Sequence, residues 1–468
     1  MEQSIPLLEE FGSSEQTSTN VTIDIEKKVD PEIPRWRKVC STLKNVLPRY
    51  LQLHGLQYDH ENLHSTAWLD SLRGYAACAV FFGHMYGFPS EGFASLPIIR
   101  LYSAGTGMVD LFFVISGYVL SFKMLQHMRN HQATRLIDCL ASSTFRRYLR
   151  LYIPTALATF FTAIMTYAGW CQPGLRKDTI IQQFLHWASD TAYASNPFAN
   201  VAGWWYPGVY RTAYLDQMWT IPVEFRGSII LFGFLAACAK LATRSRIALC
   251  CFTIFIAFYY QALYVACFLG GMLVVDLSMS WTPYEKAQQL SLPQSENGME
   301  AAKQSRAKSI TWQAGFVLIF IIGLVFLSQP QILSGELPFP YQYLILLIPS
   351  SYKDGAEHFW LSIGAILTVG ALEYSPMLQK PLKWNISLYL GELSFGIYAM
   401  HNTLVWVLYL GWLAPWKDST YPESRWPYIP ISIFMSFVVL WAADYFTRID
   451  KRIVAFGRWL QVSLFEKW

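Results

Sequence analysis

Long apolar stretches recur along this chain of 468 residues, and they constrain its fold more than any other feature. A helix needs about 20 predominantly apolar residues to cross a bilayer, and ten stretches reach or approach that length. Only 15% of the residues are charged, whereas soluble domains usually carry about 25%. The sequence therefore predicts an all-α, polytopic transmembrane helix bundle of ten spans, near residues 67–88, 105–122, 149–170, 219–239, 247–260, 262–277, 311–328, 357–374, 387–411 and 429–447.

The distribution of basic residues sets the expected orientation of these spans. Cytosolic loops of membrane proteins carry an excess of Lys and Arg. With a cytosolic N-terminus, 27 of the 36 basic residues fall on the cytosolic side and 7 on the other side. We therefore expect both termini in the cytosol. The chain then divides into a cytosolic tail over 1–66 that can include an interfacial helix, a membrane domain over 67–450 and a short cytosolic tail over 451–468.

The first predicted span carries two ionisable residues, Arg73 and His84, within the stretch WLDSLRGYAACAVFFGHMYGF. They are eleven residues apart in the chain. At about 100° per residue both lie on one face of a helix, about 16 Å apart along its axis. A charge at the centre of a span costs about 2.5–3.5 kcal/mol, and such residues usually face a bundle interior, a cavity or a partner. The plainer alternatives are an arginine that reaches the headgroups and a hydrogen-bonded structural histidine.

Three further ionisable residues lie in predicted spans. In the expected topology, Asp110 and Glu224 lie near the outer ends of the second and fourth spans, at the level of His84. His401 lies near mid-membrane in the ninth span, on a polar stripe of an otherwise apolar helix. Each has a structural alternative. Asp110 can be an acid tolerated near the interface, Glu224 can complement a helix N-terminus, and His401 can be a satisfied core histidine.

A basic stretch, TFRRYLRLYIP, overlaps the start of the third span and holds Arg146, Arg147 and Arg150. Guanidinium groups bind phosphates and carboxylates through two parallel hydrogen bonds, so these arginines are candidates for holding an anionic cofactor. The alternative is ordinary anchoring of the protein by basic residues on its cytosolic side. The eight cysteines form no C-x-x-C pair, and we predict no metal site.

The segment between the third and fourth spans, residues 171–218, is rich in aromatic residues and includes GWWYPGVYRTAYLDQMW. We expect this segment to form an outer loop. Tyr and Trp are enriched where a membrane meets water. An aromatic belt is therefore one interpretation of the segment, and a partly folded cap over the bundle is the other.

Five stretches occur in the order found in one family of membrane enzymes. They are LDSLRGYAACAVFFGH with its Arg-x10-His spacing, VDLFFVISGYVLS, FRRYLRLYIP, MWTIPVEF and LSFGIYAMH. Together they cover the chain from residue 68 to residue 401, which resembles the acyltransferase 3 family in its fungal form. One departure is that Glu224 is followed by Phe225 and Arg226, where bacterial members usually have a second acid and then an aromatic residue.

The resemblance implies transfer of an acyl group, often acetyl, from acyl-CoA to a hydroxyl of a small metabolite, lipid or glycan, with a secondary metabolite favoured. His84 is then the general base, Glu224 or Asp110 orients it, and His401 is the next candidate. Arg73 binds CoA or polarises the thioester carbonyl. No permanently bound cofactor is expected. The expected partners are acyl-CoA, the acceptor and the bilayer, and not nucleic acid.

Two other classes of protein fit part of the pattern. A proton-coupled transporter also uses Arg, His and acidic residues inside the membrane, although the sequence shows no inverted repeat of the kind that such transporters carry. A non-catalytic membrane scaffold is the second alternative, because the residues after Glu224 depart from the family pattern. We expect an enzyme.

Overall fold

The computed structural model describes residues 47–52, 55–61, 63–87, 92–197, 212–290, 298–330, 337–352 and 356–465, with the backbone alone over 282–290 and 298–310. Every regular element within these ranges is helical. The longer helices are α2 (Ala67–Tyr86), α3 (Gly105–Arg129), α4 (Ala133–Tyr167), α5 (Ile180–Ala194), α6 (Thr220–Ala237), α7 (Thr243–Tyr259), α8 (Leu263–Leu290), α9 (Gly298–Leu327), α11 (His358–Tyr374), α13 (Asn385–Leu404) and α15 (Tyr428–Leu464). The shorter elements are α10 (Tyr341–Leu344), α12 (Pro376–Gln379), α14 (Ala414–Thr420), the π-helix η8 (Val405–Leu413) and the 3-10 turns η1 (Arg49–Leu51), η2 (Phe93–Ser95), η3 (Ile99–Ser103), η4 (Pro173–Leu175), η5 (Asp216–Trp219), η6 (Ile345–Leu347) and η7 (Pro381–Lys383).

Each of the ten apolar segments expected from the sequence is helical over most of its length. Among the described residues, six helical stretches are long and apolar enough to cross a membrane: Gly105–Arg129, Ala133–Tyr167, Asp216–Ala237, Leu263–Trp281, Asn385–Thr420 and Tyr428–Leu464. A seventh results if His358–Tyr374 and Pro376–Lys383, which are bent by 99°, form one span. The all-α, multi-pass class is therefore confirmed. The ten-span count and the cytosolic termini stay predictions.

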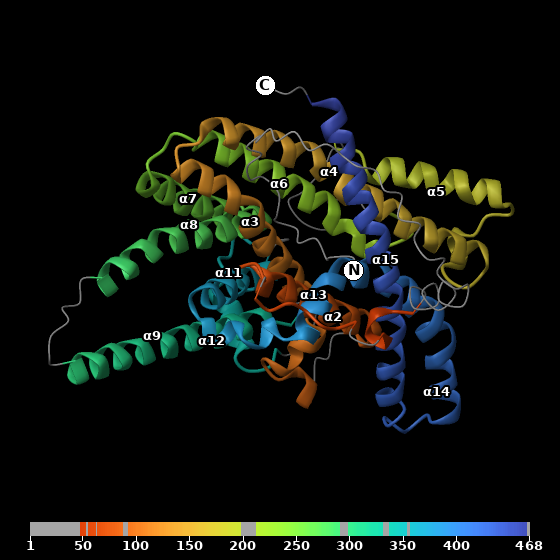
Figure 1. Cartoon of the computed structure of the whole chain (residues 1–468). Coiled ribbons are helices and arrows are strands. Elements are labelled where there is room, and N and C mark those ends of the chain that lie inside the picture. The colour runs from red at the N-terminus through yellow and green to blue at the C-terminus, as the bar shows by residue number, and fades with distance from the viewer. Residues whose placement is uncertain are drawn as a thin grey trace, which may run out of the picture.

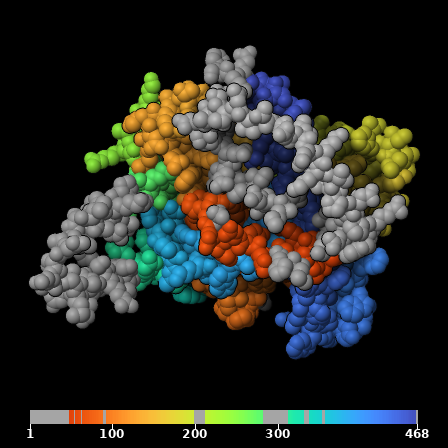
Figure 2. Space-filling view, in the orientation of Figure 1, coloured from red at the N-terminus to blue at the C-terminus, as the bar shows by residue number. Residues whose placement is uncertain are grey.

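The helices form a bundle with several projecting ends (Figure 1). α4, α5 and α6 run along the upper part of this view, and α2, α11 and α13 lie in the middle. α8 and α9 both extend to the left. α14 lies beside the first turns of α15 at the lower right, where these helices form the blue projection of the space-filling view (Figure 2). The far end of α15 reaches α4, where Ser142 Oγ donates to Gln461 Oε1 at 3.1 Å.

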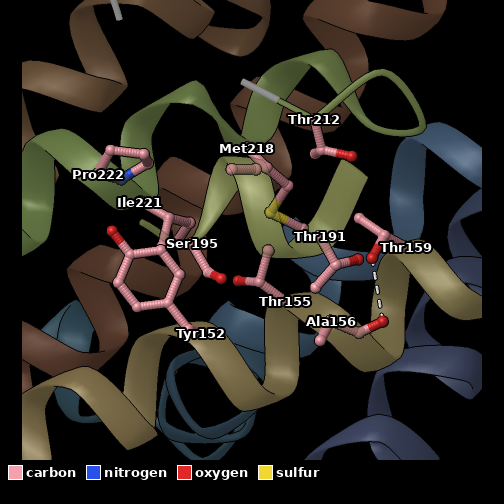
Figure 3. A pocket seen from close by; sticks show the side chains of 11 residues that line it. Tyr152, Thr155, Ala156, Thr159, Thr191, Ser195, Thr212, Met218, Ile221 and Pro222 are labelled. Carbon is pink, nitrogen blue, oxygen red and sulfur yellow. Dashed lines mark hydrogen bonds between the residues drawn. The ribbon is translucent and has the colours of Figure 1, made fainter. Parts of the chain in front are cut away.

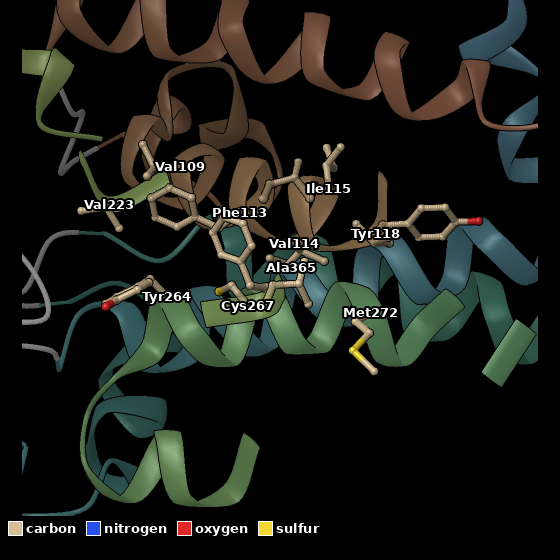
Figure 4. Packing of buried hydrophobic residues seen from close by; sticks show 14 of the residues in the cluster. Val109, Phe113, Val114, Ile115, Tyr118, Val223, Tyr264, Cys267, Met272 and Ala365 are labelled. Atoms are coloured by element: carbon tan, nitrogen blue, oxygen red, sulfur yellow. The ribbon is translucent and has the colours of Figure 1, made fainter. Parts of the chain in front are cut away.

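The apolar core is centred on α3, which packs along α8 (Figure 4). The two backbones approach closely because glycine lies at both contact points. A Cβ atom on Gly117 would lie 2.0 Å from the carbonyl oxygen of Phe268, and one on Gly271 would lie 2.0 Å from that of Val114. Small residues at helix contacts allow such packing in membranes, where van der Waals contact drives the association of helices. α3 is therefore a fixed support for the helices around it.

A buried carboxylate joins α3, α7 and α8. Asp276 of α8 is 1% exposed. It accepts hydrogen bonds from Arg246 Nε at 2.7 Å, from Arg246 Nη2 at 2.8 Å and from Arg129 Nη2 at 2.7 Å. Removal of one partner from such a buried pair leaves an uncompensated charge and is strongly destabilising. The cluster therefore fixes the relative positions of three helices.

The segment between α4 and α6, which we expected to form an outer loop, is partly folded, because α5 packs along α4. Trp187 Nε1 of α5 donates to Thr159 Oγ1 of α4 at 3.1 Å, and the Tyr148 hydroxyl donates to the carbonyl of Ser195 at 2.9 Å. Later residues of α5 thus contact earlier residues of α4, so the two helices are antiparallel. The part of the expected aromatic segment from 198 to 211 lies outside the described residues.

The segment before α2 is held against α13 and α15. Arg49 Nη2 donates to Glu392 Oε2 at 2.6 Å, and Arg49 Nε donates to Asp444 Oδ1 at 3.2 Å. The Tyr58 hydroxyl also donates to Glu392 Oε2, at 2.9 Å. Burial raises the pKa of Tyr58, and the charge of Glu392 raises it further. Within the described residues, the expected interfacial helix is reduced to the 3-10 turn η1. Residues 1–46 lie outside them, and α15 continues unbroken through most of the expected C-terminal tail.

Candidate active site

The candidate active site is built on the packing of α2 against α13. A Cβ atom on Gly74 would lie 2.3 Å from the carbonyl carbon of Leu390, and one on Gly391 would lie 2.5 Å from that of Asp70. Only glycine allows the two backbones to approach so closely. The contact fixes the register of the two helices and therefore places the ionisable residues of α2 relative to those of α13.

His84 and His401 meet across this contact, with ring centroids 5.2 Å apart. His401 is 0% exposed, and its Nδ1 lies 3.0 Å from the carbonyl oxygen of Ile397. Because a carbonyl accepts, Nδ1 carries the proton and Nε2 is left as an acceptor; Nε2 is enclosed and has no described partner. The His84 side chain is exposed, although protein surrounds it on most sides. A substrate can therefore reach His84 directly, whereas His401 lies behind it.

A polar network joins η5 and the start of α6 to α13. Asn402 Nδ2 donates to Gln217 Oε1 at 2.6 Å, and the Tyr398 hydroxyl donates to the Gln217 carbonyl. The hydroxyls of Thr220 and Tyr398 lie 2.6 Å apart. These bonds hold η5 against the helix that carries His401. The carboxylate of Asp216, also in η5, is close enough to act electrostatically on His84.

Three arginines from two helices gather near the start of α2. Arg147 of α4 is paired with Glu224, and its Nε donates to Ser228 Oγ at 2.8 Å. Arg73 Nη1 lies 3.6 Å from Asp70 Oδ1, with its side chain 27% exposed. Arg150 is half-buried, interacts electrostatically with both other arginines and has no hydrogen bond or ion pair among the described residues. This arginine cluster (Arg73, Arg147 and Arg150) therefore carries charge that protein carboxylates only partly neutralise.

Arg146 differs from the other three arginines. Its Nε donates to the carbonyl of Ser142 at 3.3 Å, within α4. Among charged side chains, Arg458 of α15 has the largest electrostatic effect on it. The structure thus brings together three of the four arginines that the sequence suggested, and it places Arg146 toward the end of α15.

The arginine cluster and the histidine pair lie at opposite ends of one helix. Arg73 and His84 belong to α2, which is uninterrupted from Ala67 to Tyr86. At about 1.5 Å per residue their separation along the axis is about 16 Å. A long, narrow ligand with an anionic end therefore matches this arrangement better than a compact one.

Among the described residues, no hydrogen bond or ion pair joins Glu224 or Asp110 to His84. Glu224 is bound to Arg147 in the arginine cluster. Asp110 is 0% exposed and lies 3.0 Å from Nδ1 of His358, the first residue of α11. Both carboxylates thus have partners of their own. The expected single layer of His84, Asp110 and Glu224 stays a prediction.

A small cavity of about 20 Å³ lies between α4, α5 and α6 (Figure 3). Its walls combine hydroxyl groups with apolar side chains, namely Tyr152, Thr155, Ala156, Thr159, Thr191, Ala194, Ser195, Thr212, Met218, Ile221 and Pro222. A cavity of about this volume holds a water molecule. None of the candidate catalytic or cofactor residues lines it, so it is separate from the site described above.

Sequence reasoning missed four polar residues around the histidines and Asp110. Gln217 directly precedes the stretch MWTIPVEF and Thr220 lies within it, but only Glu224 of this stretch was singled out. Asn402 follows His401 directly and lies four residues after Tyr398, so the two side chains are neighbours on the helix surface. The polar stripe of this helix therefore already contained a signal for Asn402. His358 gave no such signal, because it lies alone at the start of an apolar helix.

Comparison with known proteins identifies the class of protein to which this helix bundle belongs. The family model of the acyltransferase domain, Acyl_transf_3, matches residues 66–446. The chain therefore belongs to the acyltransferase 3 family, and it is an acyltransferase. No solved structure matches the chain significantly.

The similar curated proteins are fungal. O-acetyltransferase PaAT-1 of Phomopsis amygdali is 32% identical over 386 residues, which cover 74% of this chain and 73% of that protein. Acyltransferase R4 of Phoma sp. (strain ATCC 20986 / MF5453) is 23% identical over 402 residues, covering 73% and 83%. Acyltransferase clz18 of Cochliobolus lunatus is 23% identical over 347 residues, covering 66% and 70%.

Proposed function

We propose that the protein transfers an acyl group from acyl-CoA to a hydroxyl of a small acceptor, and that His84 is the general base. The observation that carries this proposal is the single helix α2, with Arg73 in the arginine cluster at one end and His84 beside His401 at the other. The phosphates of CoA bind at the arginine cluster, where Arg150 makes no hydrogen bond or ion pair with the described residues and interacts with Asp450 and Asp70 only at longer range. The pantetheine arm then extends along α2 toward His84.

The chemistry at His84 follows from the weak nucleophilicity of a hydroxyl. His84 accepts the hydroxyl proton while the oxygen attacks the thioester carbon. The tetrahedral intermediate collapses with cleavage of the carbon–sulfur bond, and the imidazolium returns the proton to the leaving thiolate. The products are the ester and free CoA. Asp216 stabilises the imidazolium electrostatically, in the role that the sequence suggested for Glu224 or Asp110.

Acetyl is the acyl group that we propose, and a fungal secondary metabolite is the acceptor. The relative that is 32% identical is named as an O-acetyltransferase. The other two relatives are named as acyltransferases, and they too are fungal. The exposed position of His84 leaves room for an acceptor larger than water.

We also propose that the chain crosses the membrane ten times with both termini in the cytosol, so that the arginine cluster faces cytosolic acyl-CoA. The helical state of all ten apolar segments and the bias of basic residues support this topology. The test is labelling of single introduced cysteines in sealed vesicles by a reagent that does not cross membranes. Ser65→Cys and Phe93→Cys, at opposite ends of α2, must label from opposite sides. Labelling of both from one side contradicts the topology.

The catalytic proposal is tested with purified full-length protein, radiolabelled acetyl-CoA and extracts that contain candidate acceptors. His84→Ala should lower kcat by about 10²–10⁴-fold, the usual contribution of a general base. His186→Ala is the matched control. His186 lies on α5, is hydrogen-bonded to the hydroxyl of Tyr214 and lies outside the histidine pair. Equal turnover by His84→Ala and wild type assigns the base to another residue.

The donor site is tested separately. Arg150→Ala should raise the KM for acetyl-CoA by about 10–100-fold, since a hydrogen bond to a charged group is worth about 1.5–3 kcal/mol. Arg135→Ala on the same helix is the control, because Arg135 is exposed and lies outside the cluster. If both variants keep the wild-type KM, CoA does not bind at the arginine cluster.

A further inference from the structure

The residue that the proposed function leaves unexplained is Arg100, in the η2–η3 segment that joins α2 to α3. Its side chain is 2% exposed, and its Nε and Nη1 are enclosed without a hydrogen-bond partner. No described carboxylate lies within 4 Å of the guanidinium, and no described group donates to or accepts from it. Burial lowers the pKa of Arg100, but an arginine remains protonated in proteins. Within the described part of the chain, nothing therefore compensates this positive charge.

The other buried cations show how unusual this is for the molecule. Among the described Arg and Lys side chains, four are buried, and three of them have carboxylate partners. Arg147 is paired with Glu224, Arg246 with Asp276 and Lys417 with Asp418. A buried charge is costly unless it is paired and hydrogen-bonded. A chain that pairs three of four buried cations internally points to an external anion for the fourth.

The groups that act electrostatically on Arg100 are tyrosine hydroxyls, and one of them, Tyr341, already has hydrogen-bond partners. The charge of Arg100 acts on Tyr341 and Tyr102. The Tyr341 hydroxyl is 2.7 Å from Ser328 Oγ and 3.1 Å from the carbonyl of Val325. Ser328 Oγ also accepts a hydrogen bond from the backbone N–H of Ile98 at 3.1 Å. These groups hold the segment in place and supply no negative charge.

The surface around Arg100 indicates where the anion comes from. Phe93, Leu96, Ile98, Ile99 and Tyr102 are large apolar or aromatic side chains of the same short segment, and all are exposed. The segment lies at the end of α2 and the start of α3, where both helices reach the end of the bundle, and it emerges at the lower edge of the space-filling view (Figure 2). Such an apolar surface around a cation is typical of protein that contacts acyl chains and headgroups together.

We propose that the η2–η3 segment binds a phospholipid, with the headgroup phosphate on the Arg100 guanidinium and the acyl chains on the exposed apolar side chains. A phosphate oxygen pair matches the planar fork of arginine. The phosphate replaces the missing carboxylate and therefore locks the connection between α2 and α3. This site is independent of the acyl-transfer proposal, because it lies at the opposite end of α2 from the arginine cluster.

The test is thermal unfolding of purified full-length protein in a maltoside detergent, followed by tryptophan fluorescence. The additives are dioleoylphosphatidylglycerol, dioleoylglycerol without a phosphate, and inorganic phosphate, at equal concentrations. Phosphatidylglycerol should raise the wild-type midpoint by about 3 °C or more once it exceeds its Kd. The other two additives should leave the midpoint unchanged.

Variants separate a ligand site from a structural charge. Arg100→Met should abolish the response to phosphatidylglycerol, while its midpoint without lipid stays equal to or above that of wild type, because the uncompensated charge is gone. Arg425→Met, at an exposed arginine, should respond as wild type does. Arg100→Lys retains the charge without the fork and should respond less. If Arg100→Met does not fold, the smaller response of Arg100→Lys tests the proposal in its place.

Three outcomes overturn the proposal. An equal rise for wild type and for both Arg100 variants places the lipid elsewhere. An equal rise with inorganic phosphate alone identifies a site for a free anion and not for a phospholipid. A lower midpoint of Arg100→Met without lipid, together with no lipid response of wild type, shows that Arg100 is a structural charge only.

Discussion

The ion pair between Arg147 and Glu224 allows a test that separates the structural assignment of Glu224 from the role that the sequence suggested. Both side chains are largely buried, with 10% and 13% exposed. Glu224→Gln removes the carboxylate charge and leaves the Arg147 guanidinium uncompensated between α4 and α6. Breaking a buried pair by removing one partner costs about 3–5 kcal/mol. We therefore expect a large loss of stability from a nearly isosteric substitution.

A second substitution isolates the energy of the pair. Arg147→Met in the Glu224→Gln background removes the stranded charge, and replacement of a whole buried pair by neutral groups is often neutral or stabilising. The double variant should therefore recover most of the stability that Glu224→Gln loses. Glu357→Gln is the control, because Glu357 is 34% exposed and lies 3.9 Å from His358 Nε2. Because the Glu357 carboxylate is partly exposed and its contact with His358 is long, its loss should cost about 0–1 kcal/mol.

The kinetic part of the test uses acetyl-CoA turnover at saturating donor, together with thermal unfolding of the same samples. If Glu224 acts on Arg147, folded Glu224→Gln protein has an altered donor KM, and the pH profile of kcat stays that of wild type. If Glu224 orients His84, kcat falls at saturating donor and its pH profile shifts. A large fall in kcat with an unchanged unfolding midpoint would refute the structural reasoning.

Four other substitutions test the packing of the bundle. Gly391→Ala places a Cβ atom 2.5 Å from the backbone of α2 and should cost about 1–3 kcal/mol by overpacking, with reduced acetyl transfer; Gly457→Ala meets nothing within 4 Å and should gain up to about 1 kcal/mol, as thermal unfolding can measure. Asp276→Asn leaves two arginines with no charge partner and should cost about 3–5 kcal/mol, while KM for acetyl-CoA in the surviving folded protein stays unchanged. Tyr398→Phe removes one donor from the network at His401 and should cost about 0.5–1.5 kcal/mol; an unchanged midpoint would show that this network does not hold η5 against α13.

The sequence was sufficient to predict which segments are helical and which residues of one helix share a face. Apolar length predicts spans because the bilayer core imposes it, and all ten segments are largely helical. The face shared by Arg73 and His84 follows from helix geometry alone, and α2 preserves it without interruption. Both results depend only on local structure, which a single sequence encodes directly.

The partners of the ionisable residues were not available from the sequence. Glu224 was expected to orient His84 or to complement a helix N-terminus, and its partner in the structure is Arg147 of α4. Asp110 and His358 are 248 residues apart in the chain and in direct contact. Neither contact leaves a local signal, because each depends on how distant helices pack.

Unpaired polar groups are the clearest link between the stability of this bundle and its function. Asp276 shows that the fold can satisfy buried charges completely, with two arginines on one carboxylate. Within the described residues, His401 Nε2 is nevertheless enclosed without a hydrogen-bond partner, and the half-buried Arg150 makes no hydrogen bond or ion pair; they lie at the two places where the proposed donor and acceptor must be held. An unsatisfied buried group costs about 1–3 kcal/mol, or more if it is charged. That free energy is available again when a ligand supplies the missing partner, so binding of CoA should stabilise the wild-type fold more than that of Arg150→Ala.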